Sequence, residues 1–239
     1  MAENDLAALV TGGGSGIGRA IALELSRRGF HTLVVGRDAQ KLTETCRLAG
    51  DRCSALPADL AVDDDITAVA RGVHDQLGRL DILVNNAAVA QLLPVSQLTF
   101  EVIDGHFAVN VGAPLKLVSR LLNLLVSSPI GQIINVSSEQ SMRPGADRVL
   151  YGATKAALNY MTRALAAELA ASGVRVNGLL PGAVDTEMLR NATGNKTLGT
   201  PLGEYLQPTE VASWIGHLID AENVTGSLIT IDGGVSLLP

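Results

Sequence analysis

Short runs of apolar residues alternate along the chain with longer stretches in which apolar positions recur every three or four residues. The short runs predict seven strands, at residues 6–10, 32–36, 53–56, 82–84, 132–137, 175–180 and 228–231. The longer stretches predict helices at residues 18–29, 38–49, 64–77, 100–127, 150–172 and 209–221. The strands are continuously apolar, as is typical of strands that are buried on both faces. This alternation predicts a Rossmann-type α/β fold, a doubly wound parallel sheet with helices on both sides.

The alternation continues without a linker, a repeat or a low-complexity segment, so we predict a single domain over residues 1–239. The 239 residues are 47% hydrophobic and 18% charged, which suffices for a large core. One long segment, residues 185–207, has no regular pattern. Loops of this length in compact α/β domains are usually functional, and we expect this one to cover the substrate as a lid.

Charge and composition disfavour several classes of function. The net charge is −6, no basic stretch occurs, and only three Phe, three Tyr and one Trp are present, which disfavours nucleic acid as a partner. No uninterrupted apolar run approaches roughly 18 residues, and the first residues are polar and acidic. We therefore expect no membrane span and a cytoplasmic location. Cys46 and Cys53 cannot build a disulfide framework, and the four scattered histidines predict no metal site.

A glycine-rich turn, Thr11-Gly12-Gly13-Gly14-Ser15-Gly16-Ile17-Gly18, joins the first predicted strand to the first predicted helix. Glycine is needed where such a turn is tight, where the backbone approaches a pyrophosphate and where the helix packs on the strand. The N-terminus of the helix directs N–H groups and a partial positive charge toward the phosphates. The turn therefore predicts a dinucleotide site with contacts from Gly12, Ser15, Gly16, Ile17 and Gly18. No Gly-Lys-Ser/Thr follows, which excludes a mononucleotide P-loop.

The tip of the second predicted strand bears on the choice of dinucleotide. An acidic residue there would bind the adenosine ribose and repel a 2′-phosphate, but Gly36 holds that position and Arg37 follows it. A guanidinium pairs with a phosphate dianion and stacks on adenine, so NADP(H) is favoured over NAD(H). NAD(H) is the alternative if Asp38 contacts the ribose, although we interpret Asp38 as the cap of the next helix.

Tyr151 and Lys155 are four residues apart in a helical pattern, so both project from one face. A lysine ammonium beside a tyrosine hydroxyl favours the tyrosinate, and we expect it to lower the pKa of Tyr151 from about 10. Tyr151 then serves as general acid toward a carbonyl oxygen or as base toward an alcohol. Ser138, at the end of the preceding strand, is placed to hold and polarise the same oxygen.

Together these features resemble the short-chain dehydrogenase/reductase family over nearly the whole chain. The matching segments are Thr11-Gly12 to Gly18, Asp59-Leu60, Asn85-Asn86-Ala87-Ala88, Asn110, Ser137-Ser138, Tyr151-Gly152-Ala153-Thr154-Lys155, Pro181-Gly182 with Thr186, and Ile231-Asp232-Gly233-Gly234. One departure from the family pattern is Ala88, where the family usually has glycine. The resemblance implies an NAD(P)(H)-dependent oxidoreductase with Ser138, Tyr151, Lys155 and Asn110 as its catalytic residues. It also implies that Lys155 holds the nicotinamide ribose and that Asn110 supports a water chain returning protons to Lys155.

The same resemblance implies further cofactor contacts by position. It assigns Asp59 and Leu60 to the adenine, Asn86 and Ala87 to the adenosine ribose, and Val184 and Thr186, beyond Pro181 and Gly182, to the nicotinamide carboxamide. Family members of this size commonly form tetramers with 222 symmetry. The apolar surfaces of the predicted helices 100–127 and 150–172 predict an oligomer, and the resemblance implies that it is a homotetramer. Asp232 and Gly233 are expected to form a tight turn at a subunit interface.

The substrate is less constrained than the reaction. In spacing, 3-oxoacyl-(acyl-carrier-protein) reductases align best, but residues 127–129 and 170–172 contain no Lys or Arg to dock an acidic carrier protein, which disfavours that partner. The chain also looks like the dicarbonyl/xylulose reductase branch in two segments, Asn85-Asn86-Ala87-Ala88-Val89-Ala90 and Ser137-Ser138-Glu139-Gln140. Arg143 and Arg148 are candidates for binding an anionic substrate, although a solvated loop is the simpler interpretation. We expect an NADP(H)-dependent reductase of a small ketone or 3-oxoacyl-type compound.

Two alternatives remain open from the sequence. The first is an NAD-dependent secondary-alcohol dehydrogenase. The second is a catalytically silent cofactor-sensing or scaffold protein, which the presence of the serine, the tyrosine and the lysine disfavours.

Overall fold

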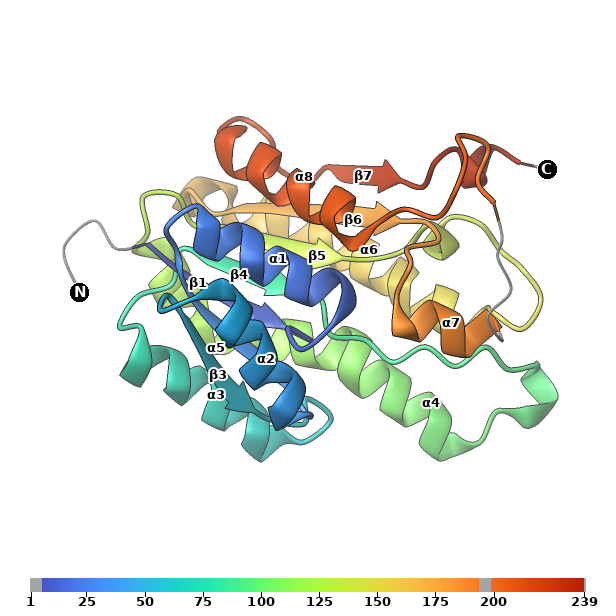
Figure 1. Ribbon diagram of the computed structural model, residues 1–239, viewed down its shortest axis with the longest axis horizontal. Helices are drawn as coiled ribbons and strands as arrows, with labels where there is room; N and C mark the ends of the chain where they lie inside the picture. The colour runs from blue at the N-terminus through green and yellow to red at the C-terminus, as the bar shows by residue number, and fades with distance from the viewer. Residues whose placement is uncertain (1–5, 194–198, 239) are drawn as a thin grey trace.

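The structure is a computed structural model that describes residues 6–193 and 199–238. Its strands form one seven-stranded parallel sheet in the order β3-β2-β1-β4-β5-β6-β7 (Figure 1). The strands are β1 (Ala7–Thr11), β2 (His31–Gly36), β3 (Cys53–Pro57), β4 (Ile82–Asn85), β5 (Gln132–Val136), β6 (Arg175–Pro181) and β7 (Leu228–Ile231). The predicted fold class is thus confirmed. The strand order reverses between β1 and β4, and ligands of such sheets bind outside the carboxyl ends of the strands at that point.

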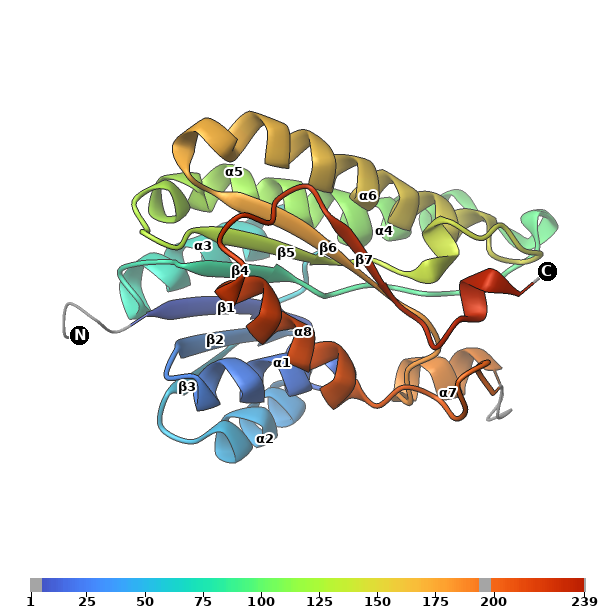
Figure 2. The same cartoon turned by 90° about the horizontal axis from the view of Figure 1, so that it is seen from above.

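Helices cover both faces of the sheet (Figure 2). One face carries α1 (Gly16–Arg27), α2 (Ala39–Ala49) and α8 (Pro208–Asp220), and the other carries α3 (Asp63–Gln76), α5 (Ala113–Val126) and α6 (Val149–Leu169). Each layer of helices buries its apolar stripe against the continuously apolar strands, which gives one core cluster on each side of the sheet. This packing leaves the carboxyl ends of the strands as the edge where loops can form a site.

Two elements differ from the sequence predictions. The helix predicted at 100–127 is α4 (Phe100–Phe107), a π-helical turn at Ala108–Gly112, and then α5. The segment 185–207, expected to be irregular, begins with the short helix α7 (Glu187–Thr193), and residues 194–198 of it lie outside the described residues. Most other boundaries differ by one or two residues; α1, for example, begins at Gly16 because Ser15 takes the extended N-cap position.

By length and composition the segment Phe100–Val126 is apolar enough to cross a membrane, since it contains an 18-residue window with a mean hydropathy of 1.3. In the fold its second half is α5, which places Leu117, Leu121 and Leu125 in the core against the sheet with no exposed surface. Burial thus accounts for the core-facing part of α5, and 44% of the apolar window as a whole is buried inside the protein.

The turn after β7 matches the sequence prediction in its local geometry. The carboxylate of Asp232 accepts hydrogen bonds from the backbone N–H groups of Gly234 and Ser236, at 2.9 and 2.6 Å. Gly233 and Gly234 both have positive φ, at +60° and +87°. Asp232 therefore closes a tight turn; its place at a subunit interface stays a prediction.

Candidate active site

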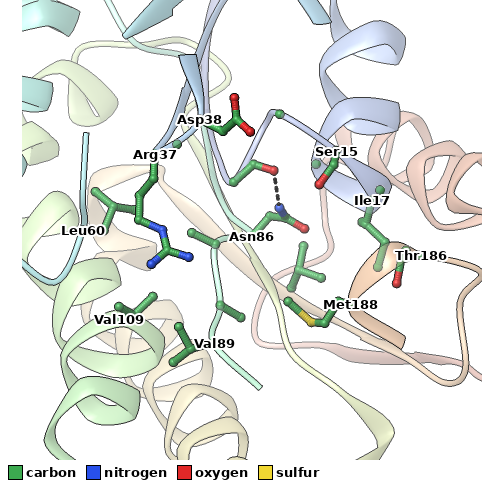
Figure 3. Close-up of a pocket in the computed structure, with 18 of the residues that line it drawn as sticks. Ser15, Ile17, Arg37, Asp38, Leu60, Asn86, Val89, Val109, Thr186 and Met188 are labelled. Carbon is green, nitrogen blue, oxygen red and sulfur yellow. Dashed lines mark hydrogen bonds between the residues drawn. The ribbon is translucent and has the colours of Figure 1, made fainter. Parts of the chain in front are cut away.

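A cavity of about 320 Å³ opens at the carboxyl ends of the central strands, within the part of the chain that the structure describes (Figure 3). It runs from the tip of β2 past the glycine-rich turn to the start of α6 and to α7. The lining contains most of the predicted site residues: Gly12, Ser15, Gly16, Ile17, Gly18, Arg37, Asp59, Leu60, Asn86, Ala87, Tyr151, Lys155 and Thr186.

The glycine-rich turn has the shape needed for a pyrophosphate. Gly12 has φ of +66°, and a Cβ on it would lie 2.9 Å from the Cα of Ala87. A Cβ on Gly18 would lie 2.1 Å from the carbonyl oxygen of Gly12. Ser15 caps α1 without a side-chain hydrogen bond, and the first turn of α1 holds no acidic residue. The N–H groups of that first turn are therefore available to an anion, and the cradle fits a dinucleotide.

We expect Gly18→Ala to destabilise the fold by about 1–3 kcal/mol and to abolish dinucleotide binding, because the added methyl group would overlap the backbone of Gly12. Thermal unfolding and a nicotinamide fluorescence titration measure the two effects. Gly105→Ala in α4 is the matched control, since a Cβ there meets no atom within 4 Å. If Gly18→Ala leaves stability and dinucleotide binding unchanged, the backbone of Gly12 does not approach residue 18 as closely as 2.1 Å from a Cβ.

Asn86 ties the glycine-rich turn to the segment after β4. Its side-chain amide donates hydrogen bonds to the carbonyl oxygens of Thr11 and Gly12, at 2.9 and 3.2 Å. The backbone N–H groups of Asn86 and Ala87 both donate to the hydroxyl of Thr11, at 2.9 and 3.0 Å. These bonds fix the two loops that flank the cavity, and a role in binding the adenosine ribose stays a prediction.

Arg37 and Asp38 behave differently at the tip of β2. The carboxylate of Asp38 accepts hydrogen bonds from the backbone N–H groups of Gln40 and Lys41, both at 3.0 Å, which confirms it as the N-cap of α2. Figure 3 shows the side chain of Arg37 extending into the cavity and the carboxylate of Asp38 turned away from it. Among the described residues the guanidinium of Arg37 has no hydrogen-bond or ion-pair partner. The site therefore offers an exposed cation to a ligand.

Lys41 and Glu187 also line the cavity, although neither was predicted from the sequence. The ammonium of Lys41 lies 2.7 Å from a carboxylate oxygen of Glu187, so the pair joins α2 to α7 beside the cavity. For Lys41 the sequence held a signal: it lies three residues after the predicted helix cap Asp38, and therefore on the first turn of α2 beside the tip of β2. Glu187 had no such signal, because α7 lies in a segment without apolar periodicity.

We expect Glu187→Gln to raise the rate of cofactor dissociation by up to about fivefold at low salt, since exposed ion pairs contribute up to about 1 kcal/mol. The effect should shrink at high salt, where the pair is screened. Stopped-flow nicotinamide fluorescence measures the rate. Glu44→Gln is the control, because Glu44 pairs with Arg47 elsewhere on α2 and does not line the cavity. Equal rates of cofactor dissociation from wild type, Glu187→Gln and Glu44→Gln at low salt would show that the ion pair does not hold α7 beside the bound cofactor.

Tyr151, Lys155 and Ser138 come together at the inner end of the cavity. Lys155 is 2% exposed, and its ammonium donates a hydrogen bond of 2.8 Å to the carbonyl oxygen of Val136 at the end of β5. The same nitrogen lies 5.7 Å from the centre of the Tyr151 ring. The hydroxyl of buried Ser138 hydrogen-bonds the side chain of Tyr151. Tyr151 and Lys155 line the cavity, as does Ser137, the neighbour of Ser138.

We expected Lys155 to lower the pKa of Tyr151, and for the protein without cofactor this direction is wrong. Burial raises the pKa of Tyr151 to about 12, and the hydrogen bond from Ser138 opposes this rise only in part. Burial also lowers the pKa of Lys155 to about 8. Desolvation is the largest cause of both shifts, and Lys155 is not among the groups that lower the pKa of Tyr151.

The buried lysine predicts a pH dependence of stability. Between pH 8 and 10.5 the unfolded chain binds more protons at Lys155 than the folded chain does, so the free energy of unfolding rises with pH in this window. Below pH 8 the full cost of burying Lys155 is present, about 3 kcal/mol. Urea unfolding at pH 7, 8.5 and 10 should show wild type gaining stability relative to Lys155→Met. A difference between the two proteins that stays constant over this range would contradict the buried, charged lysine.

Asn110 lies in the π-helical turn between α4 and α5 and is 1% exposed. Its side chain accepts a hydrogen bond from the N–H of Val89 at 2.9 Å and donates to the carbonyl oxygen of Val89 and the hydroxyl of Thr154, both at 3.0 Å. Thr154 in turn donates to the carbonyl oxygen of Tyr151 at 2.8 Å. Asn110 thus joins the loop after β4 to the start of α6, although it does not itself line the cavity.

Three predicted cofactor contacts, Pro181, Gly182 and Val184, do not line the cavity. A Cβ on Gly182 would lie 2.7 Å from the Cβ of Asp232, so this glycine serves close packing against the turn after β7. Val184 is buried and pairs with Leu206 as a parallel bridge. The cavity instead meets Thr186, Glu187 and Met188 in this part of the chain.

The arginines considered for an anionic substrate also lie outside the cavity lining. Arg143 donates a hydrogen bond of 2.8 Å to the carbonyl oxygen of Val235, and both Arg143 and Arg148 interact electrostatically with the buried carboxyl of Glu139. These contacts give the two arginines a structural role. The described residues contain no group of three or more His, Cys, Asp or Glu arranged to hold a metal ion.

The comparisons with known proteins agree with this geometry. The family described as short chain dehydrogenase matches residues 6–197. D-erythrulose reductase of Gallus gallus is 35% identical over 95% of this chain and 94% of its own length, and 3-oxoacyl-(acyl-carrier-protein) reductase of Pseudomonas aeruginosa is 33% identical over 95% and 96%. The crystal structure of 3-ketoacyl-(acyl-carrier-protein) reductase from Brucella melitensis, complexed with NADH, has a TM-score of 0.91 at 30% identity and covers 97% of this chain and 98% of that chain. The chain therefore belongs to the short-chain dehydrogenase/reductase family, oxidoreductases that act on carbonyl and alcohol substrates with a nicotinamide dinucleotide.

Proposed function

We propose that the protein is an NADP(H)-dependent reductase that transfers hydride from the nicotinamide to a small ketone or a 3-oxoacyl-type compound. The observation that carries the cofactor assignment is Arg37, an exposed guanidinium that extends into the cavity without a partner among the described residues. Asp38, the carboxylate that would have repelled a 2′-phosphate, is engaged as the N-cap of α2. A dianionic phosphate satisfies such a guanidinium with two charge-assisted hydrogen bonds.

We assign residues of the cavity to the binding of each part of the dinucleotide. The first turn of α1 would hold the pyrophosphate, Asp59 and Leu60 the adenine, and Lys155 the nicotinamide ribose. The bound nicotinamide supplies the hydride, and the protein supplies orientation and proton transfer. Asn110 is proposed to support the proton supply to Lys155 through water.

The proton at Tyr151 favours reduction as the working direction. With its pKa near 12, Tyr151 keeps its proton at neutral pH and is ready to donate it to a carbonyl oxygen as the charge on that oxygen develops. Ser138, which already hydrogen-bonds Tyr151, is placed to donate to the same oxygen. Lys155 then returns a proton to Tyr151, because its own pKa of about 8 lies close to neutral pH.

The proposed substrate class follows from the family and from the surface. One relative is named for reduction of D-erythrulose, a small ketose, and another for reduction of a 3-oxoacyl group on a carrier protein. Residues 127–129 and 170–172 contain no Lys or Arg to dock an acidic carrier, so we favour the free small ketone. We also propose that the protein is cytoplasmic and that it assembles as a homotetramer. The assembly is supported by Phe100 on α4 and Tyr160 on α6, which are 83% and 76% exposed.

The testing experiment is a titration with NADPH and then NADH, followed by nicotinamide fluorescence. We expect NADPH to bind at least about tenfold more tightly, a difference of about 1.4 kcal/mol. Turnover is then assayed with a vicinal diketone, a ketose and a 3-oxoacyl thioester. Equal or tighter binding of NADH, with faster oxidation of secondary alcohols by NAD⁺, would replace the proposal with the dehydrogenase alternative. Tight binding with no turnover on any compound would indicate a silent cofactor-binding protein.

A further inference from the structure

The two cysteines of the chain lie against each other at the edge of the sheet. Cys46 is in the last turns of α2, Cys53 is the first residue of β3, and their sulfur atoms are 3.2 Å apart. The connection is a short turn at Gly50, whose φ is +81°. The N–H of Gly50 donates to the carbonyl oxygen of Cys46 at 2.9 Å, and the N–H of Cys53 donates to that of Gly50 at 3.1 Å. The backbone therefore holds the two thiols in place.

The position of the pair makes it accessible and separates it from the cofactor cavity. The strand β3 is an edge strand that pairs with β2 alone. Cys53 begins β3, so it lies at the amino end of the strand, whereas the cavity opens at the carboxyl ends. Both cysteines are only partly buried, and neither lines the cavity. Small reagents can therefore reach the pair without passing through the site.

We propose that Cys46 and Cys53 form a redox-sensitive dithiol, which a peroxide or a low-molecular-weight disulfide closes to an intramolecular disulfide while the cofactor cavity stays intact. A disulfide needs its sulfur atoms about 2.05 Å apart, so the pair must approach by roughly 1.1 Å. Isolated partly buried cysteines are usually inert small hydrophobes. Cys46 and Cys53 differ from such isolated cysteines because each has the thiol of the other at 3.2 Å.

The reaction with hydrogen peroxide balances in two steps. The thiolate of Cys46 attacks one peroxide oxygen, the O–O bond breaks, and Cys46 becomes a sulfenic acid while hydroxide leaves and is protonated to water. The sulfur of Cys53 then attacks the sulfenic sulfur, the S–O bond breaks, and a second water leaves with the proton of Cys53. The two thiols lose two electrons and the peroxide gains them. Cys53 donates its S–H to the sulfur of Cys46, and burial together with this contact raises the pKa of Cys53, so Cys46 is the sulfur that attacks first.

The test uses the full chain with hydrogen peroxide, followed by removal of the oxidant and intact-mass measurement under denaturing conditions. Wild type is expected to lose two hydrogen atoms, to lose both free thiols by thiol titration and to recover them with dithiothreitol. Peptide mapping should find the bond between Cys46 and Cys53. A monomeric product with added oxygen atoms, a product linked between chains, or two remaining free thiols would overturn the proposal.

Single substitutions separate the roles of the two thiols. Cys53→Ser should trap the sulfenic acid at Cys46, which dimedone labels, whereas Cys46→Ser should react with peroxide more slowly. The reduced variants should bind NADPH within about twofold of wild type, which shows that they fold. Oxidised wild type should also bind NADPH within about twofold of the reduced protein. Loss of binding in the oxidised protein only would contradict the claim that the cavity stays intact.

Discussion

Replacing Tyr151 with phenylalanine is expected to lower kcat by about 10²- to 10⁴-fold while NADPH affinity stays within about twofold of wild type. The substitution removes one hydroxyl group and leaves the ring in its packing against Lys155, whose ammonium is 5.7 Å from the ring centre. Without that hydroxyl the developing charge on the substrate oxygen loses the proton donor that we propose for it. Because Ser138 remains, part of the polarisation of that oxygen survives and the rate does not fall to that of water.

The measurement is the steady-state rate with NADPH and the best ketone of the panel, together with a fluorescence titration of NADPH. Tyr160→Phe is the control, because Tyr160 lies on the same helix with 76% of its side chain exposed and outside the cavity lining. We expect that control to match wild type in both measurements. If Tyr151→Phe keeps a substantial kcat, the acid–base assignment is wrong. If it loses NADPH binding, the hydroxyl serves the cofactor rather than the substrate.

The strands were predictable because burial on both faces imposes a simple pattern. All seven occur where continuously apolar runs predicted them, within one residue at either end. The break in the helix predicted at 100–127 was harder to see, since a π-helical turn keeps the surrounding stretch helical. Pro114, near the start of α5, was a signal for a new helix start. The sequence of residues 187–193 has no apolar periodicity, and the ion pair of Lys41 with Glu187 joins this helix, α7, to α2.

In the candidate site, too, residue spacing predicted which side chains share a helix face but not the properties that depend on tertiary packing. The helical spacing of Tyr151 and Lys155 placed them on one face, and both line the cavity. The direction of the Tyr151 pKa shift was not predictable in that way, because it depends on how completely the surrounding elements remove water. The ion pair of Lys41 and the approach of Cys46 to Cys53 also depend on how α2 packs, which residue order does not specify.

Replacing Arg37 with alanine is expected to weaken NADPH binding by about 10- to 100-fold and to leave NADH binding within about threefold. The difference arises because charge-assisted hydrogen bonds to a dianionic phosphate contribute about 1.5–3 kcal/mol, and NADH has no phosphate at the 2′ position. Arg37 has no hydrogen-bond or ion-pair partner among the described residues, so its removal leaves no carboxylate unpaired. The loss should therefore appear in cofactor binding and not in thermal stability.

Fluorescence titrations of both cofactors at two salt concentrations test this expectation, with Arg47→Ala as the control. Arg47 lies on the same helix as Lys41 but pairs with Glu44 outside the cavity. Arg37→Lys keeps the charge but not the two parallel donors, so it should fall between wild type and Arg37→Ala. Equal weakening of NADPH and NADH would mean that Arg37 contacts the adenine alone. If Arg37→Ala keeps a preference for NADPH, another cation of the cavity must bind the 2′-phosphate. Lys41 is the nearest such cation in sequence.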